Sequence, residues 1–219
     1  MKNIFKSVIT ASAIFMSSFS FASDYVNSEM VKEEVKQNVA GKIVVQQFLW
    51  HKCIHCYKLE ASVDKWTETK PDFIEFERIP VTWSTKNKEE AKFYNYAKTL
   101  NKTGKMTDKE LNELNNDLFK ITFEEEKDFT AENVYPLFKK YDIDSLATFE
   151  EAINSFSASG ENLKSSNLTD KYGINGVPMF VVNGKYIVGF QTLKTGEVNP
   201  ENLFKTIEAI AKSELDKNK

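Results

Sequence analysis

The sequence has few of the residues that disordered and fibrous chains use, with 8 glycines and 5 prolines among 219 residues. Because 41% of the residues are hydrophobic, the chain can bury a core, and both of those classes are excluded. Only two cysteines are present, which excludes a disulfide-stapled scaffold and a four-thiolate metal cluster. Basic residues are not in excess either, since 29 Lys and Arg stand against 32 Asp and Glu. A net charge of −3 gives no electrostatic reason to expect a nucleic acid or an anionic membrane as partner.

The one long apolar stretch lies at the start of the sequence. Two lysines give it a positive beginning, residues 8–19 are mostly apolar, and small residues frame a cleavage tripeptide at 20–22. This pattern predicts that residues 1–22 are a secretory signal peptide cut after Ala22, and the shortness of the apolar run disfavours a membrane anchor. Cleavage leaves 27 basic residues against 32 acidic ones, a net charge of about −5. Export would place both cysteines in an oxidising compartment, the periplasm.

Both cysteines lie in one short motif between a predicted strand and a predicted helix. Residues 43–49 are rich in β-branched and aromatic side chains, which favours a strand. Residues 57–69 carry apolar side chains at helical spacing, and Pro71 ends that helix. The motif at 53–56, Cys-Ile-His-Cys, is therefore expected at the beginning of a helix.

This position has a chemical consequence for the two thiols. A thiol at the start of a helix faces unpaired amide groups and the positive end of the helix dipole, which favour the thiolate. Cys53 is therefore expected to be the exposed cysteine with a lowered pKa, and Cys56, one turn further in, the buried one. His55 lies between them with donors that can stabilise a sulfur anion. Stabilising the thiolate stabilises the reduced form, which makes the disulfide a stronger oxidant.

Other uses of these thiols stay open at this point. A structural zinc site would need His51 and His55 as its remaining ligands, which crowds all four ligands within six residues. A copper site built from Cys53, Cys56 and a histidine is harder to dismiss, although no methionine clusters with the cysteines. An inert structural disulfide would stabilise little, because a four-residue loop constrains the unfolded chain only weakly. We expect no metal at the motif.

The rest of the chain divides into a helical block and a returning sheet. Over residues 85–166 helix signatures replace strand alternation, with capping-box patterns at Thr107–Glu110 and Thr148–Glu151. Residues 179–188 then predict a hairpin that turns at Asn183-Gly184. Asn199-Pro200 has the residues typical of the cap and first turn of a last helix.

The order of these elements predicts the fold class. After a polar lead-in at 24–37, expected to be partly helical, come strand, helix, a second strand over 73–79, the helical block, a further helix, the hairpin and the last helix. This is an α/β sheet with helices on both faces, interrupted by a large insertion. The predicted division is 23–84 and 167–219 for the sheet-containing part, and 85–166 for the inserted helical domain.

At these residues the sequence resembles the DsbA family of thioredoxin-fold disulfide oxidoreductases. Residues 53–57, Cys-Ile-His-Cys-Tyr, are similar to that family's Cys-Pro-His-Cys-Tyr, and Glu60 falls where the family has an acid on the same helix. Residues 176–178, Gly-Val-Pro, with the hairpin after them, resemble its cis-proline loop. The likeness covers most of the chain after the signal peptide and is weakest over 85–135. It implies an α/β thioredoxin fold with an inserted all-helical domain.

The resemblance also implies a role for each site residue. Cys53 would form a mixed disulfide with a thiol of a reduced exported protein, and Cys56 would be the buried partner. Val177 and a cis Pro178 would lie against the sulfurs and pair with substrate in β fashion. A DsbB-like quinone oxidoreductase of the membrane would reoxidise the dithiol. The chain would act as a monomer, with no cofactor beyond the redox-active disulfide.

The motif departs from the family pattern in three ways. Ile54 replaces the usual proline, so the active-site loop is expected to be less rigid. Gln47 stands where thioredoxin-like proteins often carry a buried acid that moves a proton for the inner cysteine, and Glu60 is expected to serve instead. His51 and Lys52 are expected to add positive charge beside the reactive thiol and to lower its pKa further.

The leading hypothesis is therefore an exported thiol–disulfide oxidase. A disulfide isomerase or reductase is the alternative within the class, although isomerases usually add an N-terminal dimerisation domain. Only about 20 residues separate the predicted cleavage site from the first strand, which leaves no room for such a domain. From other classes, a copper-binding thiol protein and a chaperone that binds unfolded chains in an apolar groove remain. Cys53→Ser would leave chaperone activity intact and abolish oxidation.

Overall fold

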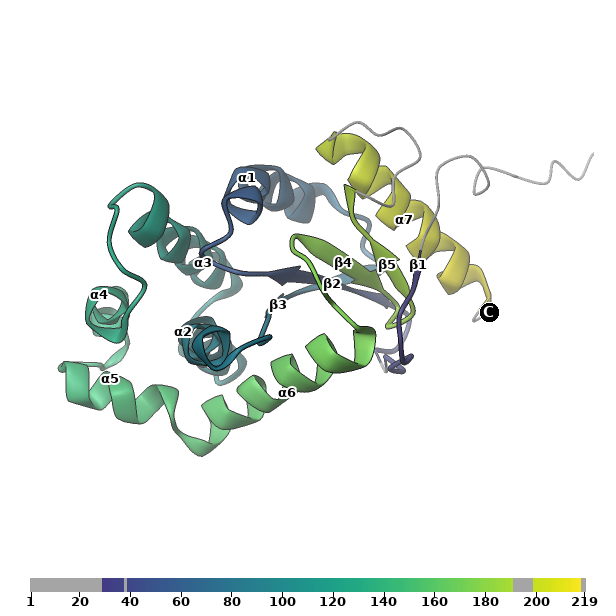
Figure 1. The fold of residues 1–219 in the computed structure, drawn as a ribbon. Helices are drawn as coiled ribbons and strands as arrows, with labels where there is room; N and C mark the ends of the chain where they lie inside the picture. Colours follow the sequence, from purple (N-terminus) through teal and green to yellow (C-terminus); the bar gives the residue numbers. More distant parts are fainter. Residues whose placement is uncertain (1–28, 38, 191–198, 218–219) are drawn as a thin grey trace, which may run out of the picture.

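The computed structural model describes residues 29–37, 39–190 and 199–217 (Figure 1). The predicted signal peptide at 1–22 lies outside the described residues, as does the beginning of the polar lead-in. Within the described ranges, no helix is long and apolar enough to cross a membrane.

Five strands form one mixed sheet in the order β1-β5-β4-β2-β3. The central strand β2 (Ile43–Leu49) pairs in parallel with β3 (Ile74–Pro80) and antiparallel with β4 (Met179–Val182). Strand β5 (Tyr186–Val188) continues the antiparallel side, and β1 (Glu29–Met30) closes the edge against it. Every residue of β2 is buried, which its nearly continuous apolar sequence requires when both faces of a sheet are covered.

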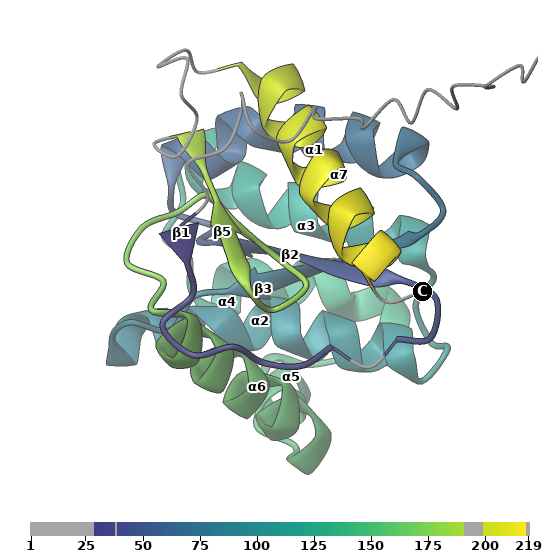
Figure 2. The same cartoon turned by 90° about the vertical axis from the view of Figure 1, so that its right-hand side faces the viewer.

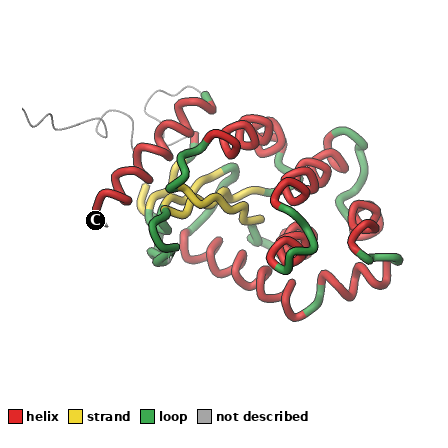
Figure 3. The backbone as a smooth tube through the Cα atoms, turned by 180° about the vertical axis from the view of Figure 1, so that it is seen from behind, coloured by secondary structure: helices red, strands yellow, loops and turns green. Residues whose placement is uncertain are grey.

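The helices cover both faces of this sheet and extend beyond the end of its central strand. They are α1 (Ile54–Thr69), α2 (Thr85–Lys102), α3 (Asp108–Phe123), α4 (Ala131–Val134), the 3-10 helix η1 (Tyr135–Tyr141), α5 (Leu146–Ile153), α6 (Phe156–Tyr172) and α7 (Pro200–Lys217). In Figure 1, α1 and α7 lie on one face of the sheet and α6 on the other, with α3, α4 and α5 to the side. Figure 3 shows the same enclosure of the strands from behind.

Helices α1 and α7 cover one face of the sheet and α6 covers the other (Figure 2). The alternation of side chains along β2 builds a separate core on each of these faces. Ile43 and Val45 point to the face that α1 and α7 cover, where they are fully buried. Phe48 points to the opposite face and packs edge-on against Tyr172 of α6, with 5.8 Å between the ring centroids. The central strand is therefore held from both sides, and its C-terminal end is a fixed point for the residues that follow it.

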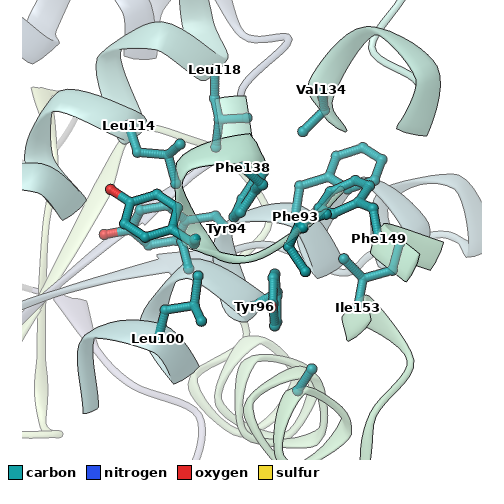
Figure 4. Close-up of a cluster of buried hydrophobic side chains, with 14 of the residues drawn as sticks. Phe93, Tyr94, Tyr96, Leu100, Leu114, Leu118, Val134, Phe138, Phe149 and Ile153 are labelled. Carbon is teal, nitrogen blue, oxygen red and sulfur yellow. The ribbon is translucent and has the colours of Figure 1, made fainter. Parts of the chain in front are cut away.

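A third core lies inside the helical block (Figure 4). Phe93 of α2, Leu118 of α3, Phe138 of η1 and Phe149 of α5 are all buried in it. The rings of Phe138 and Phe149 lie 4.8 Å apart. Because the block buries its own apolar residues, it can present α3 to α1 as a firm surface.

Several predicted local signals are confirmed. Thr107 and Glu110 form a reciprocal capping box at the start of α3. The hairpin turns at Asn183-Gly184, and the Asn199 side chain accepts a hydrogen bond from the Glu201 N–H at the start of α7.

Two predicted local features are wrong, and one predicted boundary falls inside a helix. The described part of the lead-in is not helical: Glu29–Met30 pairs as β1 with the edge of β5, and the Val31 N–H continues by donating to Lys185. The strand that pairs with Glu29–Met30 lies far along the chain. Nothing in the sequence around Glu29–Met30 therefore indicates a strand. The second capping box is also displaced, because Ser145 caps α5 by accepting from the Thr148 N–H. Helix α6 runs through the predicted domain boundary at residue 166.

Candidate active site

The fold places the two cysteines at the junction of β2 and α1. Cys53 is the N-cap residue of α1, and its carbonyl accepts the first helical hydrogen bond, from the Tyr57 N–H at 3.0 Å. Cys56 lies in the first turn and is completely buried, whereas Cys53 is partly exposed. Both are thiols in this structure.

The loop before β4 returns to this same point. The peptide bond between Val177 and Pro178 is cis, which confirms the prediction for this proline. The Cys53 thiol lies against the loop and donates to the Val177 carbonyl, with 3.6 Å between sulfur and oxygen. The structure therefore brings together two segments that are 124 residues apart in the sequence.

The two thiols differ sharply in acidity. A hydrogen bond from Cys56 lowers the pKa of Cys53 to about 6, and the backbone N–H groups of Cys56 and His55 act in the same direction. Burial raises the pKa of Cys56 far above its usual range, and its hydrogen bond to Cys53 adds to this effect. At neutral pH the outer sulfur is thus mostly a thiolate, and the inner one remains a thiol.

The expected positive charge of His51 is not present. Its ring is 2% exposed and lies among the rings of Tyr94, Phe119 and Phe129. Burial lowers the pKa of His51 to about 4, so the side chain is neutral at pH 7. The prediction that His51 adds charge beside Cys53 is therefore wrong, because the sequence did not show that the helical block covers it.

Beneath the cysteines, Glu60 lies one helical turn after Cys56 and is buried. The Arg78 Nε donates to its Oε1 at 2.7 Å, and the Asn115 Nδ2 donates to the same oxygen at 2.9 Å. Its Oε2 accepts from the Gln47 Nε2 at 3.2 Å. Burial raises the pKa of Glu60, and the charge of Arg78 partly opposes this shift. The predicted pair of Gln47 and Glu60 is thus in direct contact, below the surface.

Sequence reasoning missed two members of this cluster. Arg78 is the one arginine of a chain that otherwise uses lysine as its base, and it lies within a mostly apolar strand. That isolated choice was a usable signal, since only a guanidinium can bond several oxygens in a fixed fork. Asn115 gave no signal, because it reaches Glu60 across 55 residues from the weakest part of the family likeness.

An apolar hollow of about 400 Å³ lies beside the exposed thiol. Ile54, the second residue of the cysteine motif, is 40% exposed. The residues that line the hollow come from α1, the cis-proline loop and the beginning of α7: His55, Lys58, Leu59, Gly176, Val177, Pro178, Phe190 and Pro200. The predicted site residues Ile54, His55, Val177 and Pro178 are therefore close together around Cys53, while Gln47 and Glu60 lie beneath them.

Among the residues that the structure describes, no group of three or more His, Cys, Asp or Glu side chains is arranged to hold a metal ion.

Comparison with known proteins places the chain in a family. A family model described as a DSBA-like thioredoxin domain matches residues 72–198, more than half of the chain. The chain belongs to the DsbA family. The "Thiol:disulfide interchange protein DsbA" of Burkholderia cepacia is 32% identical over 151 residues, covering 68% of this chain and 67% of that protein. The protein of the same name from Pseudomonas aeruginosa is 28% identical over 190 residues, covering 85% and 86%.

Solved DsbA structures agree with this placement. The crystal structure of Pseudomonas aeruginosa DsbA matches with a TM-score of 0.70 and 26% identity, covering 89% of this chain and 95% of that one. The Neisseria meningitidis oxidoreductase NmDsbA1 has the same fold, with a TM-score of 0.69 at 19% identity. The α/β thioredoxin fold with helical insertion is confirmed. As a member of the DsbA family, the chain is a thiol:disulfide oxidoreductase that introduces disulfide bonds.

Proposed function

We propose that this chain acts in the periplasm on reduced exported proteins, with Cys53 as the sulfur that exchanges with substrate. The observation that carries the proposal is the difference between the two thiols. Cys53 is partly exposed with a pKa of about 6, and Cys56 is buried with a raised pKa. A sulfur that is accessible and stable as a thiolate is both the better target and the better leaving group.

The oxidising reaction has two exchange steps. A substrate thiolate attacks Cys53 in the Cys53–Cys56 disulfide; a bond forms between substrate sulfur and Cys53, and Cys56 leaves and takes up a proton. A second substrate thiolate then attacks the substrate sulfur of this mixed disulfide. The substrate gains a disulfide, Cys53 leaves as a thiolate, and the enzyme has received two electrons.

The surface residues hold the substrate near this sulfur. The Val177 backbone and Pro178 border Cys53, and an extended substrate segment would pair there in β fashion. Ile54 and the apolar hollow receive apolar side chains of an unfolded chain. His55 contributes a backbone N–H to the Cys53 thiolate.

Glu60 and Gln47 act on the proton of the inner cysteine. Cys56 must gain a proton when it leaves and lose one when it attacks, yet it is completely buried. Glu60 lies one turn away on the same helix and is the acid that can exchange this proton. Gln47, which cannot act as a base, orients the Glu60 Oε2 through its amide.

A DsbB-like quinone oxidoreductase of the membrane would restore the disulfide, and the enzyme would work as a monomer. Quinone-containing membranes from the source cell should then convert the reduced protein to the disulfide form. Failure of such membranes to do so would contradict this partner and leave the exchange chemistry untouched.

The deciding experiment is the reduction potential of the Cys53–Cys56 couple, measured by equilibration with glutathione buffers. An oxidase should be more oxidising than about −180 mV, the value typical of protein disulfide isomerase. A value near −270 mV, typical of thioredoxin, would favour the reductase alternative and contradict the proposal. In parallel, Cys56→Ser should accumulate a mixed disulfide with a reduced exported protein, and Cys53→Ser should form none.

A further inference from the structure

Asn115 connects the helical block to the acid beneath the active site. It lies on α3, is completely buried, and reaches across to two groups of the sheet-containing part. Its Nδ2 donates to the Glu60 Oε1 at 2.9 Å, and its Oδ1 lies 3.1 Å from the His51 Nε2. No other side chain of the described residues bonds both groups.

These two contacts fix the orientation of the amide and of the histidine. A carboxylate accepts hydrogen bonds, so the Asn115 NH₂ must face Glu60 and its oxygen must face His51. The His51 Nε2 must then carry the hydrogen, because two acceptors cannot face each other. His51 is thus a neutral donor that orients Asn115, and Asn115 in turn orients Glu60.

The two oxygens of Glu60 are held differently. Oε1 accepts from both Arg78 and Asn115, whereas among the residues placed in the structure Oε2 accepts only from the Gln47 amide, at the longer distance of 3.2 Å. Oε1 therefore has its hydrogen-bonding capacity largely filled, and Oε2 retains capacity for a proton. The hydrogen bonds around Glu60 thus hold Oε1 in place and leave Oε2 able to accept a proton.

We propose that Asn115 is a positioning residue for the step in which Cys56 closes the disulfide: it holds Oε1 of Glu60 and leaves Oε2 to take the Cys56 proton. The inference rests on the proposed role of Glu60 as proton acceptor. In this step the Cys56 proton passes to Oε2, the freed sulfur attacks Cys53 of a mixed disulfide, and the former partner leaves as a thiolate. The mixed disulfide supplies the oxidising equivalents.

Several neighbouring elements contribute a group that bears on the ionisation of Glu60. Helix α1 supplies Asp64, β3 supplies Arg78, α2 supplies Tyr94, and β2 supplies the Gln47 amide. His51 is linked to Glu60 through Asn115. Of these, the Arg78 charge favours the carboxylate, and Asp64 opposes it. Asn115 is the contribution of α3, so the helical block bears directly on this proton transfer.

The test uses the aromatic disulfide 5,5′-dithiobis(2-nitrobenzoate) and the reduced full-length enzyme in a stopped-flow instrument. Cys53 attacks first and releases one coloured thiolate, and Cys56 then displaces the second one. The first phase reports the Cys53 thiolate, and the second reports proton loss from Cys56. The second rate should rise with pH as Glu60 ionises and then level off.

Asn115→Leu removes both hydrogen bonds at similar volume. Loss of a hydrogen bond to a carboxylate should move the rise of the second phase upward by about one to two pH units. At a pH below that rise the second phase should slow by about tenfold or more, and the first phase should be unchanged. Asn115→Asp, which keeps the shape and places a second carboxyl against Glu60, should shift the rise in the same direction.

Asn95→Leu is the matched control. Asn95 is equally buried and also has two side-chain hydrogen bonds, but it joins α2 to α6 and does not touch Glu60. Asn95→Leu should lower the free energy of unfolding without moving the second phase. This separates the positioning role from a general loss of stability.

Glu60→Gln separates the inference from the proposal beneath it. If Glu60→Gln leaves the second phase and its pH dependence intact, the proton-acceptor role fails and the inference fails with it. If Glu60→Gln slows the second phase, but folded Asn115→Leu and Asn115→Asp both keep the wild-type pH profile, only the inference is overturned. A shifted profile in either folded Asn115 variant, with Asn95→Leu unshifted, supports it.

Discussion

Arg78 and Glu60 form an ion pair that is shielded from water, with both side chains only 3% exposed. The guanidinium also bonds Asp64 and the Asn112 amide, each at 2.7 Å, so its fork ties β3 to α1 and α3. Two charges taken out of water cost several kcal/mol each, and mutual contact and further hydrogen bonds offset that cost. Removing one partner would leave the other as a buried charge without a counter-charge, and this is the pair's main effect on stability.

Arg78→Met should lower the free energy of unfolding by about 3–5 kcal/mol, because it leaves Glu60 buried without a counter-charge. Arg78→Lys should lie between Met and wild type, since an ammonium cannot bond the same three partners at once. Urea unfolding at pH 7 measures both. Lys42→Met is the control: its pair with Glu75 is nearly half exposed and should contribute less than about 1 kcal/mol. Equal losses for Arg78→Met and Lys42→Met would contradict the argument.

The acidity of Cys53 should depend on the hydrogen of Cys56. In the reduced wild type, the rate of alkylation by iodoacetamide should rise through about pH 6 and then level off, because the thiolate is the nucleophile. Cys56→Ala removes the hydrogen-bond donor and should move this midpoint upward. Cys56→Ser keeps a hydroxyl donor and should stay closer to wild type. Indistinguishable midpoints in all three proteins would show that the hydrogen bond is not the main cause.

His51 should make the fold less stable in mild acid. Its pKa is about 4 when folded and about 6.5 when unfolded, so between these values the unfolded chain binds a proton that the folded chain does not. The free energy of unfolding should fall by about 3 kcal/mol from this cause as pH drops from 6.5 to 4. His51→Gln keeps a donor and removes the titration. Urea unfolding across this range should give a shallower pH dependence for His51→Gln, and parallel curves would contradict the prediction.

Gly184 should tolerate alanine worse than Gly104 does. Both residues are left-handed, with φ of +65° and +75°, a conformation that costs other residues about 1–2 kcal/mol. A Cβ at Gly184 would also lie 1.9 Å from the Val35 carbonyl oxygen, whereas nothing lies within 4 Å at Gly104. Gly184→Ala should therefore cost a further ~1–3 kcal/mol in unfolding free energy. Thermal and urea unfolding of the two variants measure this difference. Equal losses of unfolding free energy would show that the contact with Val35 does not matter.

The parts of the site that depend on local sequence could be predicted. The strand, the cysteine motif and the helix after it follow one another directly, so the position of Cys53 at the start of α1 was readable from spacing. The cis Pro178 was predicted from the combination of two motifs, since a proline before a strand gives no such indication alone.

The parts that depend on long-range packing could not be predicted. His51 is neutral because rings on α2, on α3 and in the loop before α4 bury it. The sequence near His51 does not indicate these contacts. The same holds for Asn115, whose partner is set by how α3 docks on α1. Strand β1 is too short for any periodicity and forms only because β5 offers it an open edge.

Trp83 lies shortly after the end of β3 and Ile174 shortly before the start of β4, and the Trp83 Nε1 donates to the Ile174 carbonyl at 2.6 Å. Residues 85–172 thus form an insertion between two strands, and a hydrogen bond joins the segments at its two ends. The neighbouring strands do not have to change their positions when such an insertion becomes longer or shorter. Insertions and deletions within residues 85–172 can therefore be tolerated. They leave the register of β2 with β3 and β4 unchanged, and with it the distance between Cys53 and Val177.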